Sequence, residues 1–196
     1  MRMRRSAAAL AVLPLVASVI FANAIAGERL PIEAGAPQDS FQRFELRLGT
    51  FVHDSLSPER GSADINGEIL VAPFDRNAGG AANVLIPRLH AGATLNMAGK
   101  TSTAYAGFTW TFDLTRKIFV EAAFGGALNN GNTGPIPVAG RNAMGCSASF
   151  REAASIGYRI NRSFSVMATV EHASNAGLCV QNRGLTNFGI RAAYAF

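Results

Sequence analysis

His172 and Ser174 are the two residues of this 196-residue chain whose types and spacing best fit a chemical reaction. They stand two positions apart in the run His172-Ala173-Ser174-Asn175-Ala176-Gly177. Side chains alternate between the faces of a β-strand, so on a strand both would point the same way. An imidazole beside a hydroxyl can act as a general base and activate it as a nucleophile. The pair therefore predicts nucleophilic catalysis, although surface strands also carry such pairs by chance.

The chain from residue 44 onward has the periodicity of the strands that such a pair needs. Apolar residues recur at every second position over segments of about ten residues, separated by clusters of Gly, Pro, Asn, Ser or charged residues. A period of two is typical of β-strands, whereas amphipathic helices repeat every three or four residues. The predicted strands cover roughly residues 44–53, 64–72, 83–95, 102–114, 118–128, 146–160, 164–174 and 186–196. The sequence thus predicts an all-β fold of eight antiparallel strands.

Each predicted strand has one apolar face and one face of small, polar or charged residues. In the segment 102–114, for example, Phe108 and Trp110 alternate with Thr109 and Thr111. A soluble barrel of the lipocalin type would turn the apolar face inward, whereas a transmembrane barrel turns it toward lipid and fills its lumen with polar groups. The alternation alone fits both architectures.

Three further features favour the transmembrane β-barrel. The chain ends on an alternating strand with Tyr194 and Phe196, which resembles the C-terminal signature of outer-membrane barrels. The segment lengths match the roughly nine to eleven residues that a tilted strand needs to cross a bilayer. Aromatic residues also stand near strand ends, as an interfacial girdle requires.

The lengths of the connections predict the orientation of this barrel. Outer-membrane barrels have short periplasmic turns and longer external loops. Residues 115–117 and 161–163 form short connections and would be periplasmic, and the longer loops 129–145 and 175–185 would be external. The connection 73–82 is longer than this scheme expects of a periplasmic turn.

The first 24 residues have the features of a cleaved secretory signal peptide. A basic start precedes an apolar run and an Ala-x-Ala exit at 22–24, which predicts cleavage near residues 24–27. The alternative is a membrane anchor, but the apolar run is short and contains Pro14. Residues 25–43 would then be a lead-in to a barrel of residues 44–196, exported to the outer membrane.

Much of the positive charge of the chain lies in the predicted signal peptide. Three of the 18 Lys and Arg residues are within it, so the remaining chain has 15 basic and 13 acidic residues and a net charge of +2 rather than +5. A nearly neutral chain gives no reason to expect a nucleic-acid partner. The residues favour no particular oligomeric state.

Cys146 and Cys179 are the two cysteines of the sequence. An exported chain meets an oxidising compartment, so a disulfide is permitted, and the barrel topology places both residues at the same external rim. His53 and His90 stand apart from other ligand residues, and the sequence has no CxxC or HExxH motif. No metal or cofactor is therefore predicted.

The run from His172 to Leu178, with Asn182-Arg183-Gly184 and a last strand ending in Phe196, resembles the lipid A 3-O-deacylase family of the PagL type. The likeness covers mainly the last third of the chain. It implies removal of the ester-linked 3-position acyl chain of lipid A, in the lipopolysaccharide of the outer leaflet, without a cofactor. It also implies roles for four residues: Ser174 as nucleophile, His172 as general base, Asn175 as oxyanion-hole donor and Asn182 as its support.

One residue departs from the family pattern. Members that carry an acid before the last strand would have a glutamate where this sequence has Thr186. If the turn at 161–163 pairs its flanking residues, Glu152 lies directly opposite His172 and on the same face, with Cβ atoms about 5 Å apart. We hypothesise that Glu152 orients His172, the alternative being that it only reaches the polar head-group zone. Glu171 adjoins His172 but faces the other way.

Two interpretations of the function follow if the barrel spans the membrane, and a soluble lipid-binding barrel is a third. The first is an outer-membrane serine esterase that remodels lipid A. The second is a non-catalytic small barrel, structural or adhesive, in which His172 and Ser174 are ordinary interface residues.

Overall fold

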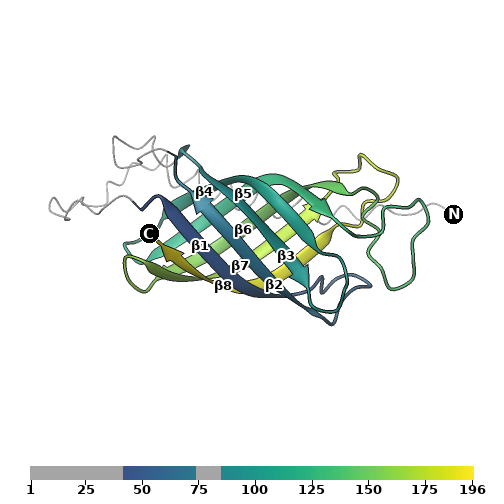
Figure 1. Cartoon of the computed structure of the whole chain (residues 1–196), viewed down its shortest axis with the longest axis horizontal. Helices are drawn as coiled ribbons and strands as arrows, with labels where there is room; N and C mark the ends of the chain where they lie inside the picture. Colours follow the sequence, from purple (N-terminus) through teal and green to yellow (C-terminus); the bar gives the residue numbers. More distant parts are fainter. Residues whose placement is uncertain (1–41, 74–84) are drawn as a thin grey trace. The chain divides into compact units, whose positions relative to one another are not determined.

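The computed structural model describes residues 42–73 and 85–196, which form a closed antiparallel barrel (Figure 1). Each strand pairs with its neighbours in sequence, and the last strand closes onto the first. The eight strands are β1 (Phe44–Val52), β2 (Ala63–Val71), β3 (Arg88–Asn96), β4 (Thr103–Asp113), β5 (Ile118–Asn129), β6 (Ala148–Arg159), β7 (Phe164–Ser174) and β8 (Leu185–Ala195). The predicted fold class is confirmed.

The N-terminal predictions fall outside this description. The predicted signal peptide and all but the last two residues of the predicted lead-in, 25–43, lie outside the described residues. Within residues 42–73 and 85–196, no helix is long and apolar enough to cross a membrane.

Two predicted strands start later than expected. Of the segment 83–95, residues 83 and 84 are outside the description, and β3 begins only at Arg88. Pro87 precedes it and has no N–H to donate to a strand ladder, so it is a natural boundary. The segment 146–160 also starts late, because β6 begins at Ala148 and Cys146 belongs to the preceding loop.

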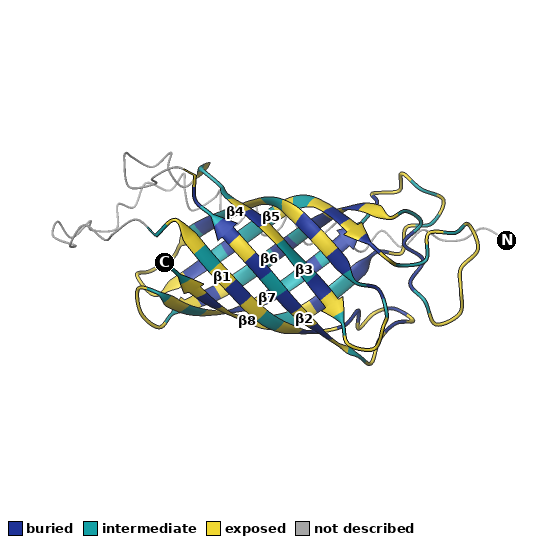
Figure 2. Ribbon diagram, viewed as in Figure 1, coloured by how far each residue is buried: buried dark blue, intermediate teal, exposed yellow. Residues whose placement is uncertain are grey.

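Charged and polar side chains are buried in the lumen of the barrel, and large apolar side chains are exposed on its outer wall. Figure 2 shows the alternation of buried and exposed residues along the strands. Arg47 is 2% exposed, whereas its neighbour Leu48 is 60% exposed. Ion pairs fill the interior, with Arg47 Nη1 3.2 Å from Glu68 Oε1 and Arg151 Nη2 2.7 Å from Glu171 Oε2. This inside-out pattern is that of a membrane barrel and excludes the soluble alternative.

The connections between the strands lie at the two ends of the barrel (Figure 1). Four loops lie at the end opposite the C-terminus: L1 (53–62), L2 (97–102), L3 (130–147) and L4 (175–184). By the rule for outer-membrane barrels, this end is external. The turns 114–117 and 160–163 lie at the periplasmic end, as predicted, and the connection between β2 and β3 is long, as the sequence indicated.

The β6–β7 turn fixes the register on which the site depends. Ile160 N donates to Phe164 O at 2.9 Å, and Asn161 Oδ1 accepts from Ser163 N and Phe164 N. An asparagine that caps the backbone in this way is a typical turn residue. Because the turn pairs its flanking residues, every pair further along the two strands is determined.

Candidate active site at the external end of β7

His172 and Ser174 share the outward face of β7, at its external end. Both are half-buried, whereas Ala173 between them faces the interior and is 4% exposed. The outward side chains below them on the same strand, Phe164 and Val166, are exposed apolar groups. The pair therefore lies where the apolar wall meets the external end, as the alternation predicted.

The imidazole of His172 is held from the side of β8. Thr186 is directly opposite His172, and its Oγ1 lies 2.8 Å from Nδ1. Nδ1–H donates this bond when the hydroxyl accepts, which leaves Nε2 as the nitrogen that can take a proton. This is the tautomer that a general base needs.

Gly184 supports the other edge of the same ring. A Cβ atom at this position would lie 2.7 Å from His172 Cε1 and 3.1 Å from Nε2. Its φ of +76° is also a conformation that favours glycine. The imidazole therefore rests on the bare backbone of L4, and a side chain at Gly184 would displace it.

Glu152, on β6, lies directly opposite His172, as predicted by counting residues from the turn at 161–163. Its charge interacts electrostatically with the imidazole. Among the described residues, however, no hydrogen bond joins the two, and Nδ1 is engaged by Thr186. The direct orientation of the ring thus comes from Thr186, where the sequence had indicated Glu152.

Asn175 has a structural role, in which its side chain holds L4 in place. The resemblance had implied that it donates to the oxyanion. It is 2% exposed, and its Nδ2 donates to Met144 O and Gln181 O, both at 2.6 Å. Both amide hydrogens are therefore used within the fold. Its backbone N donates to Asn182 Oδ1 at 2.9 Å, so the oxygen of the Asn182 amide faces Asn175. Asn182 itself is exposed.

L3 braces L4 beside the site. Cys146 and Cys179 form a disulfide with Cα atoms 6.1 Å apart. Arg183 N donates to Ala143 O at 3.1 Å, and Gln181 Nε2 donates to Pro135 O at 3.0 Å. These links restrict L4, on which Gly184 and Asn182 are carried.

A buried cluster of His53, Glu59 and Asp64, from L1 and β2, was not predicted from the sequence. His53 is fully buried, with Nδ1 3.0 Å from Asp64 Oδ2 and Nε2 3.0 Å from Glu59 Oε2. Burial alone would lower the pKa of His53, but its hydrogen bonds with Asp64 and Glu59 outweigh burial and raise the pKa to about 9. In the sequence, His53 stands apart from other residues that could bind a metal. No spacing signal relates these residues, because L1 has no repeating pattern that would predict how Glu59 folds back onto His53.

The charge of His53 predicts how stability depends on pH. Its pKa rises from 6.5 to about 9 on folding, so its ion pairs contribute fully below pH 6.5, and the contribution is lost as pH rises through 9. Wild type is expected to lose more thermal stability than His53→Gln between pH 6 and pH 10, by about 3 kcal/mol at most. Thermal unfolding in detergent at each pH measures this. Parallel pH profiles for the two proteins would contradict it.

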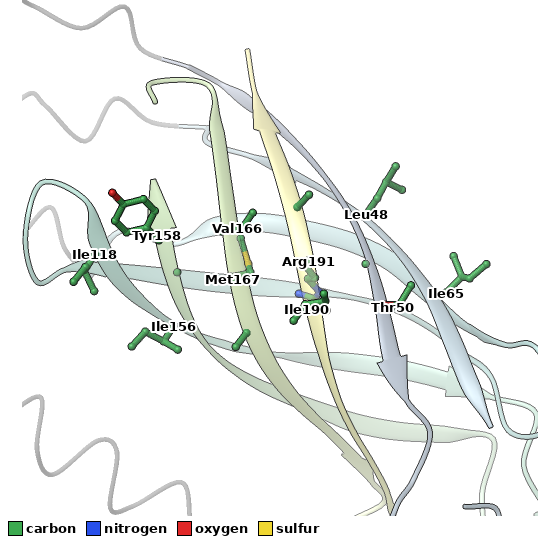
Figure 3. A pocket seen from close by; sticks show the side chains of 14 residues that line it. Leu48, Thr50, Ile65, Ile118, Ile156, Tyr158, Val166, Met167, Ile190 and Arg191 are labelled. Carbon is green, nitrogen blue, oxygen red and sulfur yellow. The ribbon is translucent and has the colours of Figure 1, made fainter. Parts of the chain in front are cut away.

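A separate apolar groove of about 960 Å³ runs along the outer wall (Figure 3). Leu48 and Ile65 lie on one side of it, and Ile118, Ile156 and Tyr158 lie on the other (Figure 3). Neither reactive residue of β7 lines it. The groove belongs to the lipid-facing wall and is not the candidate active site.

Comparison with known proteins relates the described barrel to one family. The family model described as lipid A 3-O-deacylase (PagL) matches residues 42–195. The crystal structure of the outer membrane enzyme PagL aligns with a TM-score of 0.59 at 18% identity, covering 78% of this chain and 99% of that chain. A de novo designed transmembrane β-barrel aligns with a TM-score of 0.51 at 12% identity, covering 80% and 98% of the two chains. Comparison with curated proteins gives no significant match.

Proposed function

Because this chain belongs to the lipid A 3-O-deacylase (PagL) family, we propose that it is an outer-membrane esterase that removes the 3-position acyl chain of lipid A. One observation carries the assignment of the site: His172 and Ser174 share the outward face at the external end of β7, with Nδ1 of the imidazole held by Thr186. Acyl esters of lipopolysaccharide lie at this level of the outer leaflet. Family membership also favours the enzyme over a non-catalytic barrel.

The proposed reaction is a two-step acyl transfer. His172 Nε2 takes the hydroxyl proton of Ser174 while Oγ attacks the carbonyl carbon of the ester. The tetrahedral intermediate collapses, the bond to the sugar oxygen breaks, and the imidazolium returns its proton to that oxygen. Water, activated by the same imidazole, then cleaves the acyl-serine and releases a fatty acid. Each step moves protons only through His172.

We propose Asn182 as the side chain that stabilises the oxyanion. Its Oδ1 accepts from Asn175 N, so its Nδ2 is directed away from Asn175. An amide that donates to a developing oxyanion typically contributes about 10²- to 10³-fold in rate. In this proposal Asn182 is the donor, and Asn175 positions it through the backbone and holds L4 together.

A serine-reactive lipid analogue tests the assignment of the nucleophile. A long-chain alkyl fluorophosphonate is expected to form a covalent adduct on the peptide that contains Ser174, because only an activated hydroxyl reacts quickly. Mass spectrometry of the digested protein locates the adduct, and heat-modifiable gel migration shows that the barrel is folded. His172→Ala is expected to abolish labelling at equal reagent concentration. A folded barrel that is labelled elsewhere, or equally well without His172, would refute the proposal.

A further inference from the structure

We propose that Asp54, in L1, is the positioning residue that fixes His172 from inside the barrel wall, through Thr186 on one edge of the imidazole and Gly184 on the other. This inference rests on the proposed function, because it assigns how the general base is held in place. It concerns a loop that is more than 100 residues away in sequence from the reactive pair.

Asp54 is buried and its position is fully determined by hydrogen bonds. It is 2% exposed, and its Oδ1 accepts from Thr186 N at 3.1 Å while its Oδ2 accepts from Asn142 Nδ2 at 2.8 Å. Its own backbone N donates to Asn187 Oδ1 at 3.0 Å. Its φ of 36° lies in a region that non-glycine residues seldom adopt. A backbone held in this conformation indicates a residue whose surroundings require its placement.

Both supports of the imidazole lead to this carboxylate. Thr186 holds Nδ1 with its hydroxyl and donates its backbone N–H to Asp54. Gly184, on which the ring rests, has its carbonyl oxygen bonded by Asn142 Nδ2, the same amide that donates to Asp54. A shift of Asp54 would therefore move both contacts of His172 together. Misplacement of a catalytic group by about 1 Å can cost about 100-fold in rate.

The two carboxylates that interact electrostatically with His172 have different means of acting on it. Glu152 is on β6, directly opposite His172, and Asp54 is buried in L1. Among the described residues, Glu152 makes no hydrogen bond to the residues that flank the ring. Asp54 bonds Thr186 directly and is linked to Gly184 through the Asn142 amide. Asp54 is thus distinguished from Glu152 by its hydrogen-bonded link to the two residues that hold the ring.

Asp54→Asn tests this linkage. It keeps the size of the side chain, but the new NH₂ group is a donor that faces either the Thr186 N–H or the Asn142 amide, both of which need an acceptor. The kcat for fatty-acid release is expected to fall about 10- to 100-fold with little change in KM, because the base is misplaced and the lipid contacts are kept. Asp64→Asn is the matched control: it removes another buried carboxylate, one that bonds His53 and Asn96 and touches neither support of the imidazole. Its kcat is expected to stay within about 3-fold of wild type.

A double-mutant cycle with Thr186→Val separates positioning from general destabilisation. If Asp54 acts through Thr186, the effects on kcat are expected to be non-additive, with the double variant close to the worse single variant. If Asp54→Asn gives no folded barrel, Asn142→Ala replaces it, because it breaks the link to Gly184. Additive effects, or an Asp54→Asn enzyme that behaves like Asp64→Asn, would overturn the inference alone. A wild type that releases no fatty acid by way of Ser174 would overturn the proposed function with it.

Discussion

Ser174→Ala is expected to lower the rate of fatty-acid release from lipid A by about 10³- to 10⁶-fold, because it removes the attacking atom and leaves the rest of the site in place. The side chain is small and half-buried on the outer face, so its truncation is expected to change stability by less than about 0.5 kcal/mol. Free fatty acid, measured by mass spectrometry after incubation of purified lipid A with the refolded protein, gives the rate.

Ser165→Ala is the matched control for this experiment. Ser165 is also a half-buried serine of β7, but it faces inward near the periplasmic end of the strand. The same chemical change there is expected to leave the rate at the wild-type level. Equal rates for wild type and Ser174→Ala, in barrels shown to be folded by gel migration, would exclude Ser174 as the nucleophile.

His172→Gln is expected to have the second-largest effect, a loss of about 10³-fold or more in kcat. Glutamine is polar and of similar length, but its amide cannot accept the proton of Ser174 at neutral pH. The two residues act as one unit, so the double variant with Ser174→Ala is expected to be no slower than the worse single variant. The kinetic assay described above measures all three proteins.

A lumen histidine provides the control for this prediction. His90 is buried inside the barrel and its Nδ1 is 2.9 Å from Thr109 Oγ1. His90→Gln is expected to retain activity because this residue faces away from the lipid. Full activity in His172→Gln, or additive losses in the double variant, would show that the imidazole does not serve as the base.

The barrel and the placement of the reactive pair could be predicted because they depend on strand periodicity. In a membrane barrel the apolar face of each strand points toward lipid, so the alternation of Arg47 and Leu48 already predicts which of them faces outward. The turn at 160–163 is short and capped by asparagine, so counting from it placed Glu152 opposite His172. Periodicity and one turn are local properties of the chain, and they determine register over a whole hairpin.

The supports of the imidazole could not be predicted in the same way. Register gives the strand neighbours of His172 but not its rotamer, in which Nδ1 bonds the Thr186 hydroxyl. Asp54 and Asn142 come from two loops with no repeating pattern, and they meet only after the barrel closes. Asn175 has the residue type of an oxyanion donor, but its burial and its partners in L3 and L4 depend on tertiary structure and could not be predicted from the sequence.

Mass spectrometry of lipid A from bacteria that express either the wild-type chain or Ser174→Ala tests most directly whether Ser174 removes the 3-position acyl chain. Wild type is expected to remove one ester-linked hydroxyacyl chain, located by fragmentation at the 3-position, and the lipid A of the Ser174→Ala strain is expected to stay intact. Removal of the same chain by both proteins, loss of a chain from another position, or unchanged lipid A with a folded wild-type barrel would contradict this expectation.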